Sequence, residues 1–537
     1  MKKSFFKAMV TILAISMLLT SFSTAVFAAT SEGDGSLEVV NSYSTGYSDQ
    51  DGGVAEIIAY NKDNQKAYLV NGRERTIDIL KYDEAEKSFV LDQRVDLSEM
   101  IEGFTFGDVT SVDVDTNFQR IAVAVQAEDY AANGAILILD YDGKYVTHFE
   151  CGVQPDFVMF SQDGSMVLTA DEGEPREGFG EGIVDPIGSV TIVKLEEEGQ
   201  PVTTVNFEEW DAKRDELLAK NILLKKDLKP SEDFEPEYIA MTASPREIYV
   251  SLQEANAIAT LDLESMSFTS IDSLGFKDHR EEENALDAIK DKEIKIETQN
   301  LMGARMADAI AVVEVEGKTY LFTANEGDAS EWGEGDNEYT NMTTIEAGKD
   351  AEGEAIEIEV LDKEKMEGLP EEEVDFLIGG RSFTVYEKTE EGLELVYDSG
   401  KDFEEITAKL FPENFNASHK NNKLDNRSDA KGPEPEDVSI YETEDSVYVF
   451  VALERICGVM FYEFDKANMS EGKFRAYVNN RDFSVDFPEE GADPASGDLG
   501  PEWIEIIPAE DSPTGECMLL VSNEVSGTVT LINVLAK

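Results

Sequence analysis

One short pattern recurs seven times along this 537-residue chain and constrains its fold more than any other feature. Each unit opens with a small residue or proline, then an acid in six of the seven units, and then an apolar strand. A second strand then ends in Asn, Asp or Gln, usually before Glu, and a third strand follows. The second opening position is held in turn by Glu56, Thr110, Asp156, Glu237, Asp308, Glu436 and Glu502. Such repeated strands, rich in β-branched and aromatic residues, predict an all-β fold, a seven-bladed β-propeller.

The ends of the chain suggest how the ring closes. The last unit stops after its third strand, at residues 528–534, while residues 37–43 precede the first unit as an orphan strand. We expect this N-terminal strand to pair with the last one and complete the last blade, because an open sheet edge invites aggregation. Two β-sandwiches in tandem are the alternative, but they would not require one motif shared by all units.

The N-terminus has the pattern of a secretory signal. Lys2, Lys3 and Lys7 precede an apolar run, and Val26-Phe27-Ala28 offers small residues for cleavage. We expect a signal peptide over residues 1–28, a short linker over residues 29–36 and a single propeller over residues 37–537. An uncleaved anchor is the alternative. No later segment has the ~18 apolar residues of a membrane span.

Long acidic insertions interrupt the repeat at residues 273–305, 329–380 and 401–432. Another insertion, residues 207–226, carries Trp210, Leu217 and Leu218 at helical spacing. We expect a short amphipathic helix there, and loops over one face of the propeller elsewhere.

The formal net charge of −68 restricts the partners. So many negative charges disfavour nucleic acid and anionic membranes and favour cations. Adaptation of the surface to a saline habitat is the alternative explanation. Only three cysteines and three histidines occur, without metal-ligand spacing, so neither a disulfide framework nor a histidine-rich site is expected. None of these features indicates an oligomeric state.

Hairpin geometry brings the acidic positions of the repeat together. The first strand of each unit runs along the channel and the second returns, so both motif ends meet at one channel mouth. The opening acids named above are therefore expected near the acids that close the second strands, which are Glu172, Glu254, Glu326, Glu454 and Glu524. Converging carboxylates raise one another's pKa, take basic or backbone N–H partners, or bind a cation.

The nature of the cation follows from the ligand type. Carboxylate oxygens suit Ca²⁺ or Mg²⁺ better than metals that prefer thiolate or imidazole, and we place Ca²⁺ first. Two readings remain open beside it. The acids accept hydrogen bonds or ion pairs that set the blade angles, or they take part directly in catalysis.

Three loops on the same face add further candidates. They carry Asp328 and Asp429 as metal ligands and Arg176, Arg427 and Lys431 as groups that could pair with a bound anion. A phosphoester site requires acidic side chains that hold a metal and basic side chains that bind the phosphate anion, and these loops offer both. Internal salt bridges are the alternative.

Several segments together resemble one family. They are GVAEIIAY (53–60), YLVNG (68–72), TANEGD (323–328), RSDAKGPEPE (427–436), GPE (500–502) and SNEVSGTV (522–529). They are similar to the choice-of-anchor I domain, whose members are also labelled mesenchyme-specific cell surface glycoprotein-like or alkaline phosphatase-like. The resemblance implies an exported propeller, usually tethered by a C-terminal anchor. No such anchor follows the last strand, so we expect a secreted or extracellular protein, held at the surface, if at all, without a covalent anchor.

Three functional hypotheses follow. The first is a module that binds an unknown ligand or surface partner at its acidic mouth, with a divalent cation. The second is a metal-dependent phosphoesterase with Glu172, Asp328 and Asp429 as metal ligands, although the chain offers no nucleophile motif. The third is a purely structural surface protein. Whether the protein is an enzyme stays open at this point.

Overall fold

The computed structural model describes residues 30–197, 199, 201–243, 246–349, 353, 355–485 and 496–535. The expected signal peptide, residues 1–28, lies outside them. The described chain is all-β, and its α-helices are short: α1 (Arg214–Ala219), α2 (Pro230–Asp233) and α3 (Asp402–Leu410). No helix among these residues is long and apolar enough to cross a membrane.

The strands of the repeat form antiparallel sheets of four or five strands. In the first three sheets the strands are β3 (Ile58–Asn61), β4 (Lys66–Asn71), β5 (Thr76–Asp83), β6 (Ser88–Asp96); β7 (Phe106–Asp115), β8 (Arg120–Ala127), β9 (Asn133–Leu139), β10 (Tyr145–Val153); and β11 (Pro155–Phe160), β12 (Met166–Asp171), β13 (Ser189–Lys194), β14 (Val202–Asn206). The next two contain β16 (Pro236–Met241), β17 (Glu247–Leu252), β18 (Ala257–Asp262), β19 (Ser267–Ser273); and β22 (Ile310–Val315), β23 (Lys318–Ala324), β30 (Phe383–Thr389), β31 (Gly392–Asp398).

The last two large sheets contain β32 (Pro435–Glu442), β33 (Ser446–Leu453), β34 (Val459–Asp465), β35 (Asn468–Asn479), β1 (Thr30–Gly33); and β36 (Pro501–Ile507), β37 (Met518–Asn523), β38 (Thr528–Val534), β2 (Leu37–Ser44). The first, second and third strands expected from the repeat are thus confirmed, with ends that shift by a few residues.

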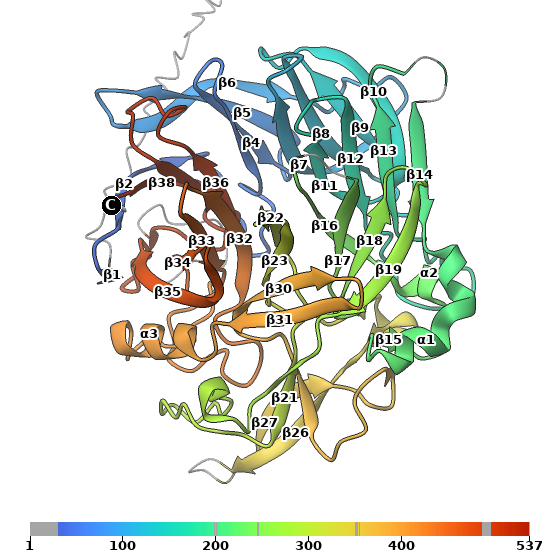
Figure 1. Cartoon of the computed structure of the whole chain (residues 1–537), viewed down its shortest axis with the longest axis vertical. Coiled ribbons are helices and arrows are strands. Elements are labelled where there is room, and N and C mark those ends of the chain that lie inside the picture. Colours follow the sequence, from blue (N-terminus) through green and yellow to red (C-terminus); the bar gives the residue numbers. More distant parts are fainter. Residues whose placement is uncertain are drawn as a thin grey trace, which may run out of the picture.

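The sheets stand around a common centre, as in a β-propeller (Figure 1). The first strand of each sheet lies innermost and contacts its neighbours in a circle that runs through β3, β7, β11, β16, β22, β32, β36 and back to β3. Apolar side chains fill the space between adjacent sheets. Tyr43, Ile58 and Leu520, for example, form one cluster between the first and the last sheet. Sheets buried on both faces explain why most strands have few polar positions.

The N-terminal strand closes the last sheet as expected. β2 pairs antiparallel with β38, with Leu37 opposite Val534 and Ser44 opposite Thr528. The linker expected at residues 29–36 is only partly a linker, because its residues 30–33 form β1, which pairs with the edge of β35. β35 is the longest strand, 12 residues, and it extends far enough to receive this partner.

The insertions form smaller sheets beside the ring, in the lower part of Figure 1. Their strands are β20 (Phe276–Asp278), β21 (Leu301–Ala304), β29 (Asp375–Ile378); β24 (Glu331–Trp332), β25 (Tyr339–Thr340); β26 (Met342–Lys349), β27 (Ala355–Leu361); and β15 (Leu224–Lys225), β28 (Met366–Glu367). The helix expected over residues 207–226 is shorter. A 3₁₀-helix, Glu208–Lys213, leads into α1, and the backbone turns at Asn221, which has φ of 59°, before β15 begins.

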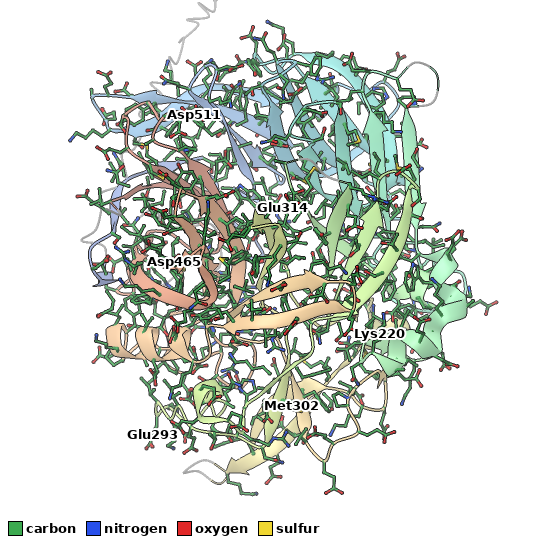
Figure 2. The ribbon with its side chains drawn as sticks, viewed as in Figure 1. Lys220, Glu293, Met302, Glu314, Asp465 and Asp511 are labelled. Atoms are coloured by element: carbon green, nitrogen blue, oxygen red, sulfur yellow. The ribbon has the colours of Figure 1, made fainter. Side chains whose placement is uncertain are left out.

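Carboxylates are spread widely over the outside of the molecule. Figure 2 labels Glu293, Asp465 and Asp511, which lie far apart in the view. All three cysteines are free thiols, in agreement with the expectation that disulfides do not hold this fold.

Candidate functional site

The opening acids of the repeat leave the strand ladder where each inner strand begins. In β11, β16, β32 and β36 the register shifts directly after the opening proline, at Asp156, Glu237, Glu436 and Glu502 respectively. Such a bulge turns the side chain away from the regular alternation of the strand. It therefore gives the acids a direction that the flanking apolar residues do not share.

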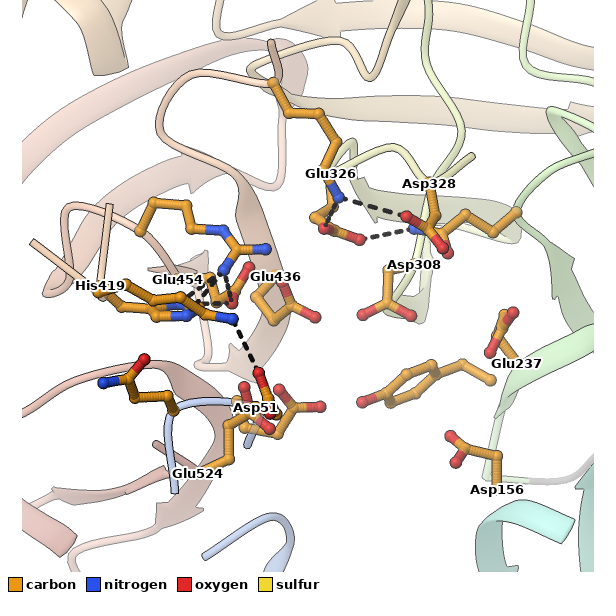
Figure 3. Close-up of a pocket in the computed structure, with 17 residues that line it drawn as sticks. Asp51, Asp156, Glu237, Asp308, Glu326, Asp328, His419, Glu436, Glu454 and Glu524 are labelled. Carbon is orange, nitrogen blue, oxygen red and sulfur yellow. Dashed lines mark hydrogen bonds and ion pairs between the residues drawn. The ribbon is translucent and has the colours of Figure 1, made fainter. Parts of the chain in front are cut away.

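These acids line one cavity of about 430 Å³. In Figure 3 the carboxylates of Asp156, Glu237, Asp308, Glu436 and Glu524 point into a common space. Of the residues predicted from the sequence, those that line it are Asp156, Glu237, Asp308, Glu326, Asp328, Glu436, Glu454, Glu502, Glu524 and Lys431. The repeat thus brings together at one place most of the acids expected there.

The other predicted residues lie beside the cavity or away from it. Glu172 is adjacent, because its carboxylate lies within 4.8 Å of those of Asp156 and Glu237. Glu56 is close enough to Asp156 and Glu524 for their charges to raise its pKa, although burial is the larger cause. Glu254 does not line the cavity; burial raises its pKa to about 8, against the opposing charge of Lys225.

The structure does not bring the remaining predicted loop residues into the cavity lining. Asp429 pairs with Lys290 at 3.1 Å. Arg427 pairs with Glu434 at 2.7 Å, and Arg176 with Glu174 at 2.9 Å. The internal salt bridges considered for these loops are thus present at Arg176 and Arg427. Lys431 forms them as well, with Glu326 and, at 3.2 Å, with Glu434.

Among the residues that the structure describes, three groups of carboxylates lie close enough to share an ion, with ligand atoms within 4.8 Å of one another. They are Asp156–Glu172–Glu237, Asp308–Glu326–Glu436 and Glu326–Glu434–Glu454. The third group is already neutralised by basic side chains. Arg455 reaches Glu434 at 2.8 Å and Glu454 at 2.9 Å, while Lys431 and Arg427 also contact Glu434.

The pKa shifts of the acids differ between this third group and the other carboxylates of the cavity. Burial, followed by the charges of neighbouring carboxylates, raises the pKa of Glu237, Glu436 and Glu502 well above the usual range. Burial also raises the pKa of Asp156, to about 7. At Glu434 burial acts in the same direction, but Arg455, Lys431 and Arg427 outweigh it and hold the pKa well below the usual range. Basic side chains therefore surround the third group, whereas in the other two groups they reach only Glu326, through Lys431, and Glu172, through Arg176 at 3.8 Å.

One carboxylate oxygen in the second group has no partner. Glu436 is only 8% exposed, and its Oε2 is buried without a hydrogen bond. Glu326, next to it, accepts hydrogen bonds from Gln253 and from Lys431. A buried acceptor without a donor costs free energy, so this oxygen marks a place where a positive ligand would be stabilised.

Three aromatic side chains pack together beside the opening acids. Phe157, Tyr238 and Trp503 each follow an opening acid, and their ring centroids are 4.8 to 6.2 Å apart. Tyr238 also lines the cavity. Tyr238 thus brings one aromatic ring to the wall of the acidic cavity, and apolar surface there strengthens the interactions of the carboxylates with ions.

A second set of acids on the inner strands links neighbouring sheets by hydrogen bonds. Asp113 accepts a hydrogen bond from the backbone N–H of Phe160 at 2.6 Å. Asp437 does the same with Ile504 at 3.0 Å, and Glu505 with Tyr60 at 2.9 Å. Each bond joins one inner strand to the next. Carboxylates that set the blade angles thus exist, but they are not the opening acids.

The sequence interpretation missed several residues in or beside the cavity, of which His419 and Arg455 line it and Glu434 contacts two residues that do. Glu434 stands one residue before an opening proline, and its place in PEPE (433–436) could have indicated it. His419, which lies 3.1 Å from Glu454, and Arg455, which lies beside both, have no comparable signal. His419 comes from the insertion over residues 401–432, and no repeat predicts its position.

Together, the ring of sheets and the buried acidic cavity define an all-β protein of the β-propeller class with a candidate cation site near its centre. The chain belongs to the choice-of-anchor I domain family, whose family model matches residues 56–467.

One curated relative and several solved structures are similar to parts of the chain. Gigasin-3a of Magallana gigas is 33% identical over 162 residues, 29% of this chain and 56% of that protein. The chain thus spans little more than half of that relative's length. Hydrazine synthase of Kuenenia stuttgartiensis has a TM-score of 0.45 at 10% identity, covering 90% of this chain and 97% of that chain. The Cps50 (Swd1) β-propeller domain of Myceliophteria thermophila has a TM-score of 0.41 at 9% identity, covering 89% and 96%. Likeness at this level carries no argument about function.

Proposed function

We propose that this protein is a secreted or surface-associated module that binds a ligand or partner at its acidic cavity together with a divalent cation, with Ca²⁺ ahead of Mg²⁺. Membership in the choice-of-anchor I domain family supports the surface location. The cation is supported by a ligand set made of oxygens, which Ca²⁺ and Mg²⁺ prefer.

The observation that carries this proposal is the group Asp308–Glu326–Glu436. Its carboxylates lie within 4.8 Å of one another, and the buried Oε2 of Glu436 has no partner. One cation there would satisfy that oxygen and compensate the charges of Asp308 and Glu436, since Lys431 already pairs with Glu326. Ca²⁺ tolerates an irregular set of oxygen ligands better than Mg²⁺, which demands near-octahedral geometry.

Calorimetric titration of the chelator-treated protein with CaCl₂ tests the proposal. We expect saturable binding, and a rise of the thermal midpoint that EDTA reverses. Glu436→Gln keeps the size of the side chain and removes its charge, and should weaken Ca²⁺ binding by ~10-fold or more. Asp429→Asn is the matched control, because Asp429 is also an acid of this face but lies outside the cavity. Equal affinities for both variants and the original chain would disprove the site.

We propose further that the seven large sheets are seven blades of one domain over residues 37–537, with β1 attached to its edge. The circle of contacts among the inner strands and the pairing of β2 with β38 support this closure. Export by a signal peptide over residues 1–28 belongs to the same proposal.

A metal-dependent phosphoesterase is the second candidate. One observation favours it: basic residues line the same cavity as the carboxylates, among them Lys420, Lys431 and Arg455. Positive side chains beside a metal could bind the oxygens of a phosphoester. Ca²⁺-dependent hydrolysis of a phosphomonoester or phosphodiester, abolished in Asp328→Ala, would favour the enzyme. A purely structural surface protein, the third hypothesis, would show neither Ca²⁺ binding nor hydrolysis.

A further inference from the structure

The repeat builds two of the carboxylate groups from the same three positions. Each group combines the opening acid of one unit, the closing glutamate of that unit and the opening acid of the next unit. The first, which we call the Glu436 group, lies at the fifth and sixth large sheets and consists of Asp308, Glu326 and Glu436. The second, the Glu237 group, lies at the third and fourth large sheets and consists of Asp156, Glu172 and Glu237.

Both closing glutamates begin the same kind of turn. Glu172 is followed by Gly173, with φ of 72°, and Glu326 is followed by Gly327, with φ of 89°. Glycine adopts this left-handed conformation without the strain that a side chain would add. The chain therefore leaves the second strand of the two units, β12 and β23, in the same way.

Each closing glutamate also has one basic neighbour, but the two neighbours differ in how they pair. Lys431 contacts Glu326 directly. Arg176 lies 3.8 Å from Glu172 and donates its hydrogen bond to Glu174 instead, at 2.9 Å. The Glu237 group therefore keeps more of its negative charge than the Glu436 group.

The carboxylate of Glu237 itself has no donor. Glu237 is 9% exposed, and its carboxylate points into the cavity (Figure 3). Among the described residues, no basic, amide or hydroxyl group donates a hydrogen bond to it or forms an ion pair with it. The carboxylates of Asp156 and Glu172 lie within 4.8 Å of it. Carboxylates packed together in this way require either bound protons or a cation.

We infer that Asp156, Glu172 and Glu237 bind a second divalent cation, at a site that the repeat makes equivalent to the Glu436 group. The inference rests on the proposed function and extends it, because it gives the acidic cavity two ions in place of one. All three side chains offer carboxylate oxygens, which select a hard cation such as Ca²⁺ or Mg²⁺. The ion would give the carboxylate of Glu237 the positive partner that the protein does not supply.

The positions of the two groups indicate what the ions do for the fold. Asp156 lies in β11 and Glu172 follows β12, both in the third large sheet, whereas Glu237 lies in β16 of the fourth. An ion at the Glu237 group would tie these two sheets together at the cavity, as an ion at the Glu436 group would tie the fifth to the sixth. Loss of one ion should therefore loosen one junction of the ring and leave the other unchanged.

Calcium stoichiometry tests the inference. The intact chain, dialysed against CaCl₂ in ~0.15 M NaCl to screen unspecific binding, should hold two more ions by elemental analysis than a variant with both Glu237→Gln and Glu436→Gln. Each single variant should hold one ion more than the double variant, and Ca²⁺ should raise its thermal midpoint less than that of the intact chain. Glu254→Gln is the matched control and should keep both ions, because Glu254 closes the unit that Glu237 opens but belongs to none of the three carboxylate groups.

The outcomes separate this inference from the proposed function. If Glu237→Gln holds as many ions as the intact chain while Glu436→Gln loses one, the second site is overturned and the first stands. If Glu237→Gln loses one ion and Glu436→Gln loses none, the second site is supported and the first is contradicted. Should Glu237→Gln not fold, as judged by circular dichroism, Asp156→Asn at the more exposed member of the group replaces it, and the same loss of one ion is expected.

Discussion

Two glutamates on the same inner strand, β36, have different roles. Glu502 opens β36 and lines the cavity, whereas Glu505, three residues later on the same strand, accepts the backbone N–H of Tyr60 in the neighbouring sheet. Both are glutamates on an apolar strand, so their difference depends on what each side chain meets. The first contributes to a site and the second holds two sheets together.

The buried carboxyl group of Glu505 should make stability depend on pH. Burial raises its pKa from 4.5 to about 8. Between these values the folded chain keeps a proton that the unfolded chain releases, so stability falls as pH rises from about 4.5 to about 8. Glu505→Gln should reduce this loss by roughly 1–3 kcal/mol, as measured by urea unfolding at both pH values. An unchanged pH dependence would show that Glu505 does not hold its proton.

At the scale of elements, β2 joins the beginning of the described chain to its last strand. It pairs along β38, and its Leu37 and Tyr43 are buried against the neighbouring strands. The hydroxyl group of Tyr43 also donates to Asp78 at 2.7 Å, in the first sheet. β2 therefore connects the last sheet to the first as well as covering an edge.

Removal of residues 30–44 should therefore destabilise the protein by about 3 kcal/mol or more, because two large apolar side chains leave the core. The exposed edge of β38 should also promote association. Thermal unfolding and size-exclusion chromatography measure the two effects. Removal of residues 30–34 alone, which takes away β1 and keeps β2, serves as the control, and equal behaviour of both truncated chains would contradict the role of β2.

For the whole molecule, the net charge of −68 opposes the compact state. Like charges spread over one folded surface repel each other, and salt screens that repulsion. The thermal midpoint should therefore rise between ~0.05 M and ~1 M NaCl. Differential scanning calorimetry with a metal chelator present separates this effect from cation binding. A midpoint that falls with NaCl would mean that ion pairs such as those of Glu434 outweigh the repulsion.

The sequence by itself determined the strands of the repeat, their grouping into the large sheets and the convergence of most opening acids, but not the small sheets of the insertions. These follow from local periodicity and from a spacing that is repeated seven times, and both can be read without knowing which segments touch. The pairing of β2 with β38 follows in the same way, because each end of the chain carries an incomplete unit.

Only the tertiary structure decided which acids carry a positive partner and which do not. Glu326 meets Lys431 across 105 residues, and Glu434 collects Arg427, Lys431 and Arg455 in one place. Asp429, from the same loop as Lys431, turns instead to Lys290. Loops of the insertions follow no repeat, and electrostatic energy depends on distances of a few ångströms between distant segments, so the sequence pattern holds no information about these partners.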